Sequence, residues 1–290
     1  MRKILLPALL IALLLCGCGR IERAPAPIST VDPYAGKVQA ESGYGTKIWI
    51  TEYEELPVNP LREVNVAETT YLTGDDGVTY VMQRGIDVSE HQGEIDWAAV
   101  AASGDAEFAI IRVGYRGYGE AGTLNADARY RENIRGALDH GLTTGLYFFS
   151  QATSEEEAAE EADYLLTLLE GFSPADFALP IFFDWEEIGV EQARTDGVDG
   201  ETMTRCALAF CERLQAAGYR CGIYAYRSLA YFRYDLPQIA DYPLWIAAVG
   251  NCPDFYYRFA VWQKSTVGEI PGIEGNVDVD VIFLPLDGET

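Results

Sequence analysis

The 290-residue sequence is poor in histidine and in positive charge. Its two histidines, His91 and His140, are too few for a zinc site built on several imidazoles. With 21 lysines and arginines against 45 aspartates and glutamates, the net charge is −24, which argues against general binding to a nucleic-acid backbone. Carboxylates are the abundant titratable groups, so aspartate and glutamate are the first candidates for acid–base catalysis.

Two further motifs are missing. No G-x-S-x-G sequence occurs, which disfavours a serine hydrolase of the nucleophile-elbow type. The glycine-rich stretch Val113–Gly119 is not followed by Lys-Ser or Lys-Thr, so it does not predict a phosphate-binding loop.

Cysteine pairs with metal-binding or redox spacing are also absent from the body of the chain. Beyond the two cysteines near its start, the sequence has Cys206, Cys211, Cys221 and Cys252, and no two of them form a CxxC pair. This spacing argues against a zinc ribbon or a thioredoxin-type motif. It leaves open whether one disulfide forms or all four remain thiols.

The start of the sequence resembles a bacterial lipoprotein signal. The apolar run Ile4–Leu15 follows two basic residues and is too short for a membrane-spanning helix, which needs about 20 residues. Gly17 and Cys18 follow it, so we expect residues 1–17 to be removed and Cys18 to carry a lipid. The alternative is an ordinary secretory signal. Either way the mature protein acts outside the cytoplasm, anchored to the cell membrane or secreted.

Residues 18–82 precede the regular part of the sequence. Residues 18–45 are proline-containing and poor in large apolar side chains, which is typical of a tether. Residues 46–82 contain the strand-like runs Lys47–Thr51 and Val78–Val81. They are too few to bury a core of their own, so they predict a small β appendage.

From residue 83 to 290, apolar runs of strand length alternate with helical patterns at about 96–103, 125–140, 154–170 and 200–217. The runs are Ile86–Val88, Phe108–Val113, Thr144–Phe149, Leu179–Trp185, Cys221–Tyr226, Leu244–Val249, Phe259–Trp262 and Val277–Phe283. Alternation of this kind predicts parallel strands joined by right-handed crossovers. Because little room for helices remains between the last three strands, the sequence predicts an α/β fold: a flattened, incomplete TIM-like (β/α)5β3 barrel. An open doubly wound sheet is the alternative.

Acidic residues lie at three of these strands. Asp87 ends the first, Asp184 and Glu186 end the fourth, and Asp278 and Asp280 lie in the last. Active sites of such barrels form at the carboxyl ends of the strands. Since side chains alternate along a strand, Asp184 and Glu186 should point to the same side.

The Asp184–Glu186 pair has the properties that glycosidic cleavage needs. Burial beside aromatic side chains and repulsion between the two acids should raise the pKa of one member and keep it protonated near neutral pH. A proton donor beside a charged carboxylate is the arrangement found in glycosidases. The structural alternative is that these acids cap loops or pair with Arg112 or Arg116.

Several ordered motifs over about residues 84–285 resemble glycoside hydrolase family 25, the Chalaropsis-type lysozymes. The opening motif is Gly85–Gly93 with Ile95-Asp96-Trp97, and Phe183–Glu186 matches the Asp-x-Glu of the family. Further matching stretches are Ala109–Gly114, Gly145–Phe149, Gly222–Tyr224, Leu244–Ala247 and Gly275–Asp278.

This resemblance implies hydrolysis of the β-1,4 bond between N-acetylmuramic acid and N-acetylglucosamine in peptidoglycan, without a metal or cofactor. It implies that Glu186 is the proton donor, that Asp184 is its partner carboxylate, and that Asp87 and Asp278 are the other two acids of the groove. Two departures, Phe148 and Lys264, stand where the family often has histidine and an aromatic residue. Because they concern substrate positioning, they affect the expected sugar preference rather than the chemistry.

Aromatic residues near strand ends are candidates for binding the glycan strand: Tyr115, Tyr147, Tyr224 and Trp262. The partners we expect are therefore peptidoglycan strands and, through the lipid, the membrane, with the protein acting as a monomer. The alternatives are a non-catalytic glycan-binding barrel and another retaining hexosaminidase. A degenerate binder usually loses the Asp-x-Glu pair, which this sequence keeps.

Overall fold

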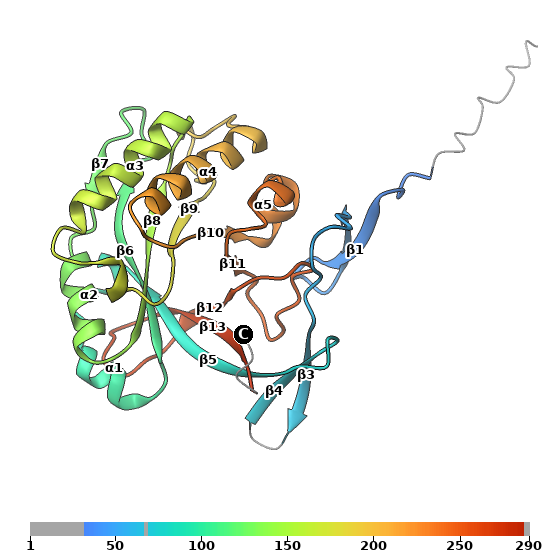
Figure 1. Cartoon of the computed structure of the whole chain (residues 1–290), viewed down its shortest axis with the longest axis horizontal. Helices are drawn as coiled ribbons and strands as arrows, with labels where there is room; N and C mark the ends of the chain where they lie inside the picture. The colour runs from blue at the N-terminus through green and yellow to red at the C-terminus, as the bar shows by residue number, and fades with distance from the viewer. Residues whose placement is uncertain (1–31, 67–68, 287–290) are drawn as a thin grey trace, which may run out of the picture. The chain divides into compact units, whose positions relative to one another are not determined.

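The computed structural model describes residues 32–66 and 69–286, drawn in colour in Figure 1. The expected signal peptide and the lipidation site Cys18 lie outside the described residues. The chain divides into residues 1–35 and residues 36–290, and the second unit carries all the strands and helices described here.

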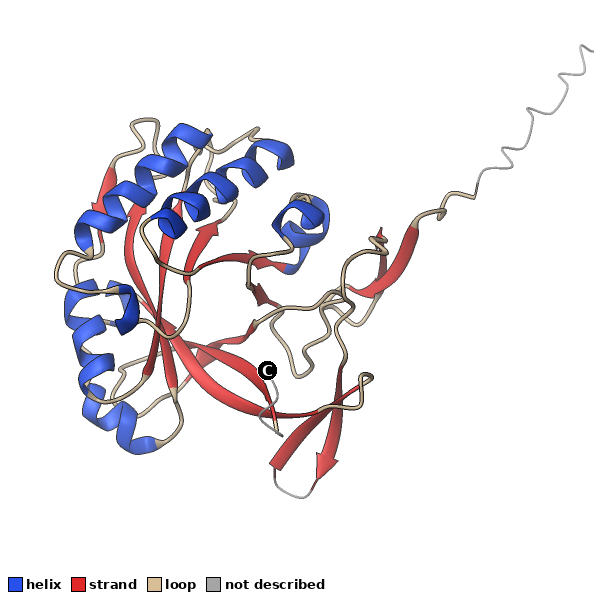
Figure 2. Ribbon diagram, in the orientation of Figure 1, coloured by secondary structure: helices blue, strands red, loops and turns tan. Residues whose placement is uncertain are grey.

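Eight strands of one sheet form a closed hydrogen-bonded ring (Figure 2). Each overlaps one of the eight apolar runs, which confirms the predicted barrel. Every neighbouring pair is parallel except the two pairs made by the last strand, which is antiparallel to both of its neighbours. In order around the ring the strands are β5 (Thr79–Val88), β6 (Phe108–Arg116), β8 (Thr143–Ser150), β9 (Ile181–Trp185), β10 (Cys221–Tyr226), β11 (Leu244–Ala247), β12 (Val261–Gly268) and β13 (Val277–Pro285).

Helices follow the first five barrel strands and, in the described chain, none lies between β11 and β12 or between β12 and β13. This distribution is the (β/α)5β3 order predicted from the sequence. The helices are α1 (Trp97–Ser103), α2 (Tyr130–Asp139), α3 (Glu155–Leu168), α4 (Gly200–Ala216), and α5 (Arg227–Phe232) with the short α6 (Leu236–Ile239). Short 3-10 turns occupy Glu90–Gln92 and Pro174–Asp176.

One helix begins later than the sequence predicts. Leu124–Ala126 form a short strand, β7, that pairs antiparallel with the end of β6, so α2 starts at Tyr130 rather than near residue 125. The predicted helix end is correct, because Gly141 has a φ of 79° just beyond α2. Glycine adopts this left-handed backbone conformation without strain, and the conformation ends the helix.

The side chains inside the barrel form their own apolar cluster, separate from the layer between strands and helices. Its buried members are Phe108, Ile110, Tyr147, Phe182, Tyr224, Trp245 and Val261. Glycines on neighbouring strands make room for these rings. A Cβ on Gly85 would lie 2.4 Å from the Phe108 ring, and one on Gly222 would lie 2.5 Å from the Phe182 ring. These apolar side chains therefore fill one end of the barrel interior. The polar residues described below lie at the other end, where the parallel strands finish.

The N-terminal strands form two hairpins, of which one is a separate two-stranded sheet and the other extends the barrel sheet. The hairpin of β1 (Lys37–Glu41) and β2 (Lys47–Thr51) spans the expected tether boundary at 45/46. The hairpin of β3 (Leu61–Val66) and β4 (Thr69–Gly74) adds onto the first half of β5. Because β5 runs unbroken from Thr79 to Val88, the expected boundary at 82/83 falls inside a barrel strand.

These N-terminal residues cover the flank of the barrel that lacks helices. The buried Asn59 donates hydrogen bonds from Nδ2 to the carbonyls of Pro253, at 2.6 Å, and Phe255, at 2.9 Å, in the loop between β11 and β12. The Tyr257 hydroxyl donates to the Thr51 carbonyl at 2.7 Å. Ile50 is buried in the main core. The appendage and this loop together take the place that a helix occupies beside the earlier strands.

Candidate active site

Because β13 is antiparallel to β5, acids of the first and the last barrel strand lie close together. Because β13 runs against β5, its first residues meet the last residues of β5. Asp278 is directly opposite Asp87 in the strand register, and Asp280 is opposite Gly85. Two of the four acids predicted for the site thus come from one strand pair.

The other two acids come from the carboxyl end of β9. Asp184 is buried, while Glu186 lies just beyond the strand and is partly exposed. The two side chains share a hydrogen bond, as expected for residues two apart on one strand. The charge of Glu186 acts on Asp87, and both act on Asp184, so the structure brings the predicted acids into one cluster.

Gln263 of β12 connects the acids of β5 and β13. Its Nε2 donates to Asp87 Oδ2 at 2.8 Å and to Asp278 Oδ2 at 3.1 Å. Its Oε1 accepts a hydrogen bond from the Tyr224 hydroxyl at 3.1 Å. The amide therefore fixes both carboxyl groups, and Tyr224 fixes the amide.

Asp280 lies beneath this layer and is wholly buried. Its Oδ1 accepts a hydrogen bond from Trp245 Nε1 at 2.8 Å. Asp280 also shares a hydrogen bond with Asp87. Sequence reasoning assigned no role to Asp280 or Gln263, although each is a polar residue on an inward-facing position of its strand.

The acid cluster is not neutralised by ion pairs. Among the residues that the structure describes, no lysine or arginine forms a salt bridge with Asp87, Asp184, Glu186 or Asp278. The two arginines considered as partners are engaged elsewhere. Arg112 pairs with Asp127 at 2.8 Å and with Glu90 at 3.3 Å, and Arg116 pairs with Glu160 and Glu161. The structural alternative, in which these arginines pair with the acids, is therefore wrong.

Burial without a cationic partner shifts the titration of the whole cluster. Burial, followed by the charge of Asp278, raises the pKa of Asp87 to about 8. Burial and the neighbouring Glu186 raise the pKa of Asp184 well above its ordinary value. The pKa values of Glu186 and Asp278 also rise, in both cases chiefly through burial. The sequence predicted an upward shift for one member of the Asp-x-Glu pair, and the structure shifts both upward.

Two of the four predicted sugar-binding aromatics, Tyr147 and Tyr224, lie beside this cluster. Tyr147 and Tyr224 flank Trp245, with ring centroids 5.8 Å and 4.7 Å away, and form the buried floor below the acids. Tyr115 is partly exposed, and its ring lies 5.1 Å from the Arg112 guanidinium.

Trp262 is a correction to the sequence prediction. Its neighbours Val261 and Gln263 belong to the interior of the barrel, so strand alternation turns Trp262 outward. There it is buried, stacks on Phe283 and donates from Nε1 to the Ala248 carbonyl at 2.9 Å. It is a core residue, not a sugar platform.

The two departures from the family pattern also lie outside the acid cluster. Phe148 is buried against Phe210 of α4 in the outer core, with ring centroids 6.2 Å apart. Lys264 places its ammonium 5.6 Å from the Trp262 ring. Both positions alternate with inward-facing residues, so the expectation that they act in substrate positioning is not supported by their placement.

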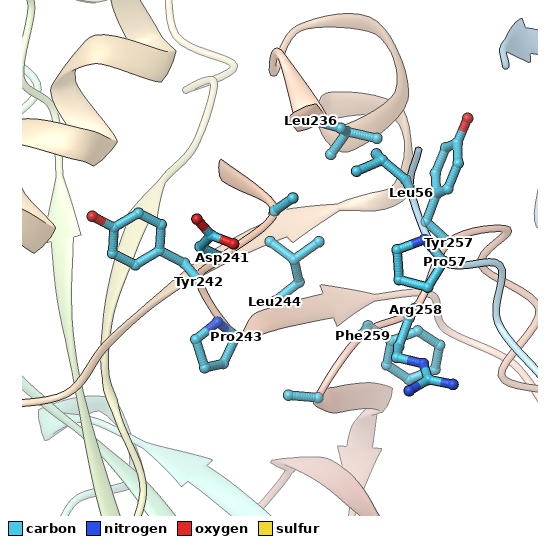
Figure 3. Close-up of a pocket in the computed structure, with 12 residues that line it drawn as sticks. Leu56, Pro57, Leu236, Asp241, Tyr242, Pro243, Leu244, Tyr257, Arg258 and Phe259 are labelled. Carbon is cyan, nitrogen blue, oxygen red and sulfur yellow. The ribbon is translucent and has the colours of Figure 1, made fainter. Parts of the chain in front are cut away.

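A cavity of about 280 Å³ lies at the opposite ends of the strands, where β11 and β12 begin (Figure 3). Asp241 and Tyr242 lie on one side of it and Tyr257 and Arg258 on the other. Pro57 of the N-terminal appendage completes its wall. It contains no pair of carboxylates, so the acid cluster remains the candidate for chemistry.

Other expected features can be placed within residues 32–66 and 69–286. Cys206, Cys211 and Cys221 are buried free thiols. No group of three or more histidine, cysteine, aspartate or glutamate side chains in these residues is arranged to hold a metal ion. No helix in the same residues is both long and apolar enough to cross a membrane.

Comparison with known proteins agrees with the geometry. The model of the glycosyl hydrolases family 25 matches residues 86–273. Lysozyme M1 of Streptomyces globisporus is 28% identical over 264 residues, which is 88% of this chain and 80% of that protein. The part matched by the family model begins within β5 and includes the Asp-x-Glu strand β9.

Solved structures show the same barrel. A bacterial lysozyme from Streptomyces coelicolor superposes with a TM-score of 0.58 and 26% identity, covering 69% of this chain and 91% of that one. The modular autolysin LytC from Streptococcus pneumoniae, solved in complex with a synthetic peptidoglycan ligand, gives a TM-score of 0.59 at 25% identity. That match covers 76% of this chain and 57% of LytC.

Proposed function

This chain belongs to the glycosyl hydrolases of family 25, and we propose that it is a lysozyme that cleaves the β-1,4 bond between N-acetylmuramic acid and N-acetylglucosamine in peptidoglycan. The observation that carries the proposal is the cluster of Asp87, Asp184, Glu186 and Asp278, which has no salt-bridge partner and in which burial raises the pKa of every member. Buried acids of this kind are costly unless they serve a purpose.

Glu186 is the proton donor in this proposal. It is the most accessible member of the Asp-x-Glu pair, and burial raises its pKa, so it keeps its proton at a higher pH than a free glutamate. As the glycosidic bond breaks, this proton passes to the leaving oxygen, and positive charge develops on the sugar that remains. Glu186 then accepts a proton from the water that completes hydrolysis.

Asp184 is the partner carboxylate. Its place beside Glu186 on β9 suits it either to attack the anomeric carbon or to stabilise the substrate's own acetamido group as it attacks. Asp87 and Asp278 face the pair from β5 and β13 and hydrogen-bond the sugar beside the scissile bond. Tyr115, Tyr147 and Tyr224 supply aromatic surface for the glycan strand.

The experiment is digestion of purified peptidoglycan, with the new reducing ends identified by mass spectrometry. We expect reducing-end N-acetylmuramic acid, with no products from the Asp184→Asn/Glu186→Gln double variant. Reducing-end N-acetylglucosamine would instead indicate a different hexosaminidase. Binding to the wall without cleavage would favour a non-catalytic glycan-binding barrel and contradict the proposal.

The location follows from the N-terminal sequence. We propose that Cys18 carries a lipid that anchors the mature, monomeric protein to the outer side of the cell membrane, within reach of the wall. Its support is the basic pair, the apolar run and the small residue before Cys18.

A further inference from the structure

We propose that Asp280 is a positioning residue of the active site, a neutral carboxyl group that donates a hydrogen bond to Asp87 and so orients it toward the substrate. The inference rests on the proposed function, because Asp87 is one of the acids of the groove. It goes further by assigning a role to a carboxyl group that does not reach the substrate.

The position of Asp280 fixes its neighbours. On β13 it lies opposite Gln263 of β12 on one side and Gly85 of β5 on the other. It is wholly buried, so its carboxyl group is not exposed to bulk water. Trp245 of β11 approaches it from across the barrel interior.

The hydrogen bonds of Asp280 favour a neutral carboxyl group. Its Oδ1 accepts from the Trp245 indole N–H at 2.8 Å, but its Oδ2 receives no hydrogen bond from any donor in the described chain. A buried carboxylate with one bare oxygen is costly. A proton on Oδ2 removes that cost and turns the atom into a donor, and the acceptor with which Asp280 shares a hydrogen bond is Asp87.

The charged and titratable groups around the pair favour the same arrangement. Asp278 acts on both Asp87 and Asp280, and Glu186 acts on Asp87. These neighbours are all carboxyl groups. The hydroxyls of Tyr147 and Tyr224 are neutral, because burial raises their pKa values. Arg112, the nearby cation, is bonded to Asp127 and Glu90. An ionised Asp280 would add a further negative charge to this group.

A neutral Asp280 benefits Asp87. The hydrogen bonds from Gln263 and Asp280 both lower the pKa of Asp87, against the larger effects of burial and Asp278. With a donor on each side, the Asp87 carboxyl is held in one orientation and loses its proton more readily. Without Asp280, Asp87 would keep its proton to a higher pH and would be held by Gln263 alone.

The test compares two substitutions of similar size. Asp280→Leu removes both hydrogen bonds, whereas Asp280→Asn keeps an acceptor for Trp245 and a donor for Asp87. On soluble wall fragments we expect Asp280→Leu to lower kcat/KM by about tenfold or more and to move the limb of the pH profile at which Asp87 titrates upward by about one unit. Asp280→Asn should restore most of the rate and return the limb toward the wild-type position.

Two outcomes would overturn the proposal. A folded Asp280→Asn enzyme as impaired as Asp280→Leu would show that Asp280 acts as a charge. An Asp280→Leu enzyme in which the limb at which Asp87 titrates is unmoved would show that Asp280 only packs against its neighbours. Thermal unfolding midpoints check that each variant is folded.

A measurement independent of activity covers the case in which the leucine variant does not fold. Infrared difference spectra at neutral pH should show a protonated-carboxyl band in the wild type that is lost in Asp280→Asn. An identical spectrum in both proteins would refute the neutral Asp280. Because this readout needs no turnover, it separates failure of this inference from failure of the proposed lysozyme activity.

Discussion

Asp278 of β13 lies directly opposite Asp87 of β5 across an antiparallel strand pair. In a barrel made of parallel strands alone, the start of the last strand would lie at the far end from the active site. Reversing β13 brings its first residues to the carboxyl end of β5, where Gln263 of β12 bonds both acids. The site therefore depends on the direction of one strand as much as on the identity of its acids.

The proton donor can be tested by Glu186→Gln, which keeps the size of the side chain and removes its proton. We expect kcat on wall fragments to fall by about 10²–10⁴-fold, the usual contribution of general acid catalysis. The thermal midpoint should change little. Glu170→Gln, at an exposed glutamate beyond α3, is the matched control and should keep full activity. Near wild-type turnover by Glu186→Gln would refute the assignment.

The buried acids should make stability depend on pH. Asp87 titrates near 3.8 when unfolded and near 8 when folded. Between these values the folded state binds a proton that the unfolded state lacks, so its stabilising effect is complete at low pH and is lost as the pH rises toward 8. We expect a higher thermal midpoint at pH 5 than at pH 8.

Asp87→Asn should reduce that difference by at least about 2 °C, while the other buried acids maintain part of it. Asp139→Asn, at an exposed aspartate, is the control and should leave it unchanged. An equal pH dependence in Asp87→Asn and wild type would mean that Asp87 does not hold a proton in the folded protein.

The appendage should contribute to stability without contributing to catalysis. Asn59→Ala leaves the carbonyls of Pro253 and Phe255 without their donor, so we expect the free energy of unfolding to fall by about 1–3 kcal/mol. Urea unfolding measures this change, and kcat should remain that of the wild type. Gln39→Ala, at an exposed position of β1, should stay within about 0.5 kcal/mol of the wild type. Equal stability of the two variants would show that the appendage does not support the barrel.

Much of the fold could be predicted because it depends on local patterns. Buried strands appear as apolar runs, and glycines such as Gly141 end helices, so eight strands and four helices could be found without tertiary information. The reversed direction of β13 was missed, although residues 269–276 form a link shorter than the dozen residues that a parallel crossover needs. The length of this link alone indicates that β12 and β13 are antiparallel.

The site was less predictable where both faces of a strand are apolar. Trp262 and Val261 are both large apolar residues, so alternation shows that they point to opposite sides but not which one points inward. Gln263 decides the question, because its amide bonds Asp87 and Asp278. These bonds join residues far apart in the sequence, and only the closed ring reveals them.

The lipid anchor has a direct test. Cys18→Ala removes the thiol that would carry the lipid, so we expect the protein to appear in the medium or to remain unprocessed. Fractionation followed by mass spectrometry of the N-terminal peptide measures both outcomes. Cys16→Ala is the matched control and should leave the protein in the membrane fraction. A processed Cys18→Ala protein that stays membrane-bound would refute lipidation at this residue.

The last prediction concerns the interaction between Asp184 and Glu186. Burial raises the pKa values of both acids, and each acts on the other. In the proposed mechanism Asp184 is the charged partner, so its negative charge should help Glu186 to keep its proton. Asp184→Asn removes that charge and keeps the size of the side chain, so the basic limb of the pH profile, where Glu186 loses its proton, should move to lower pH. The variant also loses the carboxylate that stabilises the developing positive charge, and kcat should fall by about 10²–10³-fold. If Asp184 were instead the protonated member and donated a hydrogen bond to Glu186, Asp184→Asn would keep that donor and the limb would stay in place, whereas Asp184→Ala would move it to higher pH. The pH dependence of kcat/KM for the three proteins on soluble wall fragments therefore shows which of the two acids carries the proton.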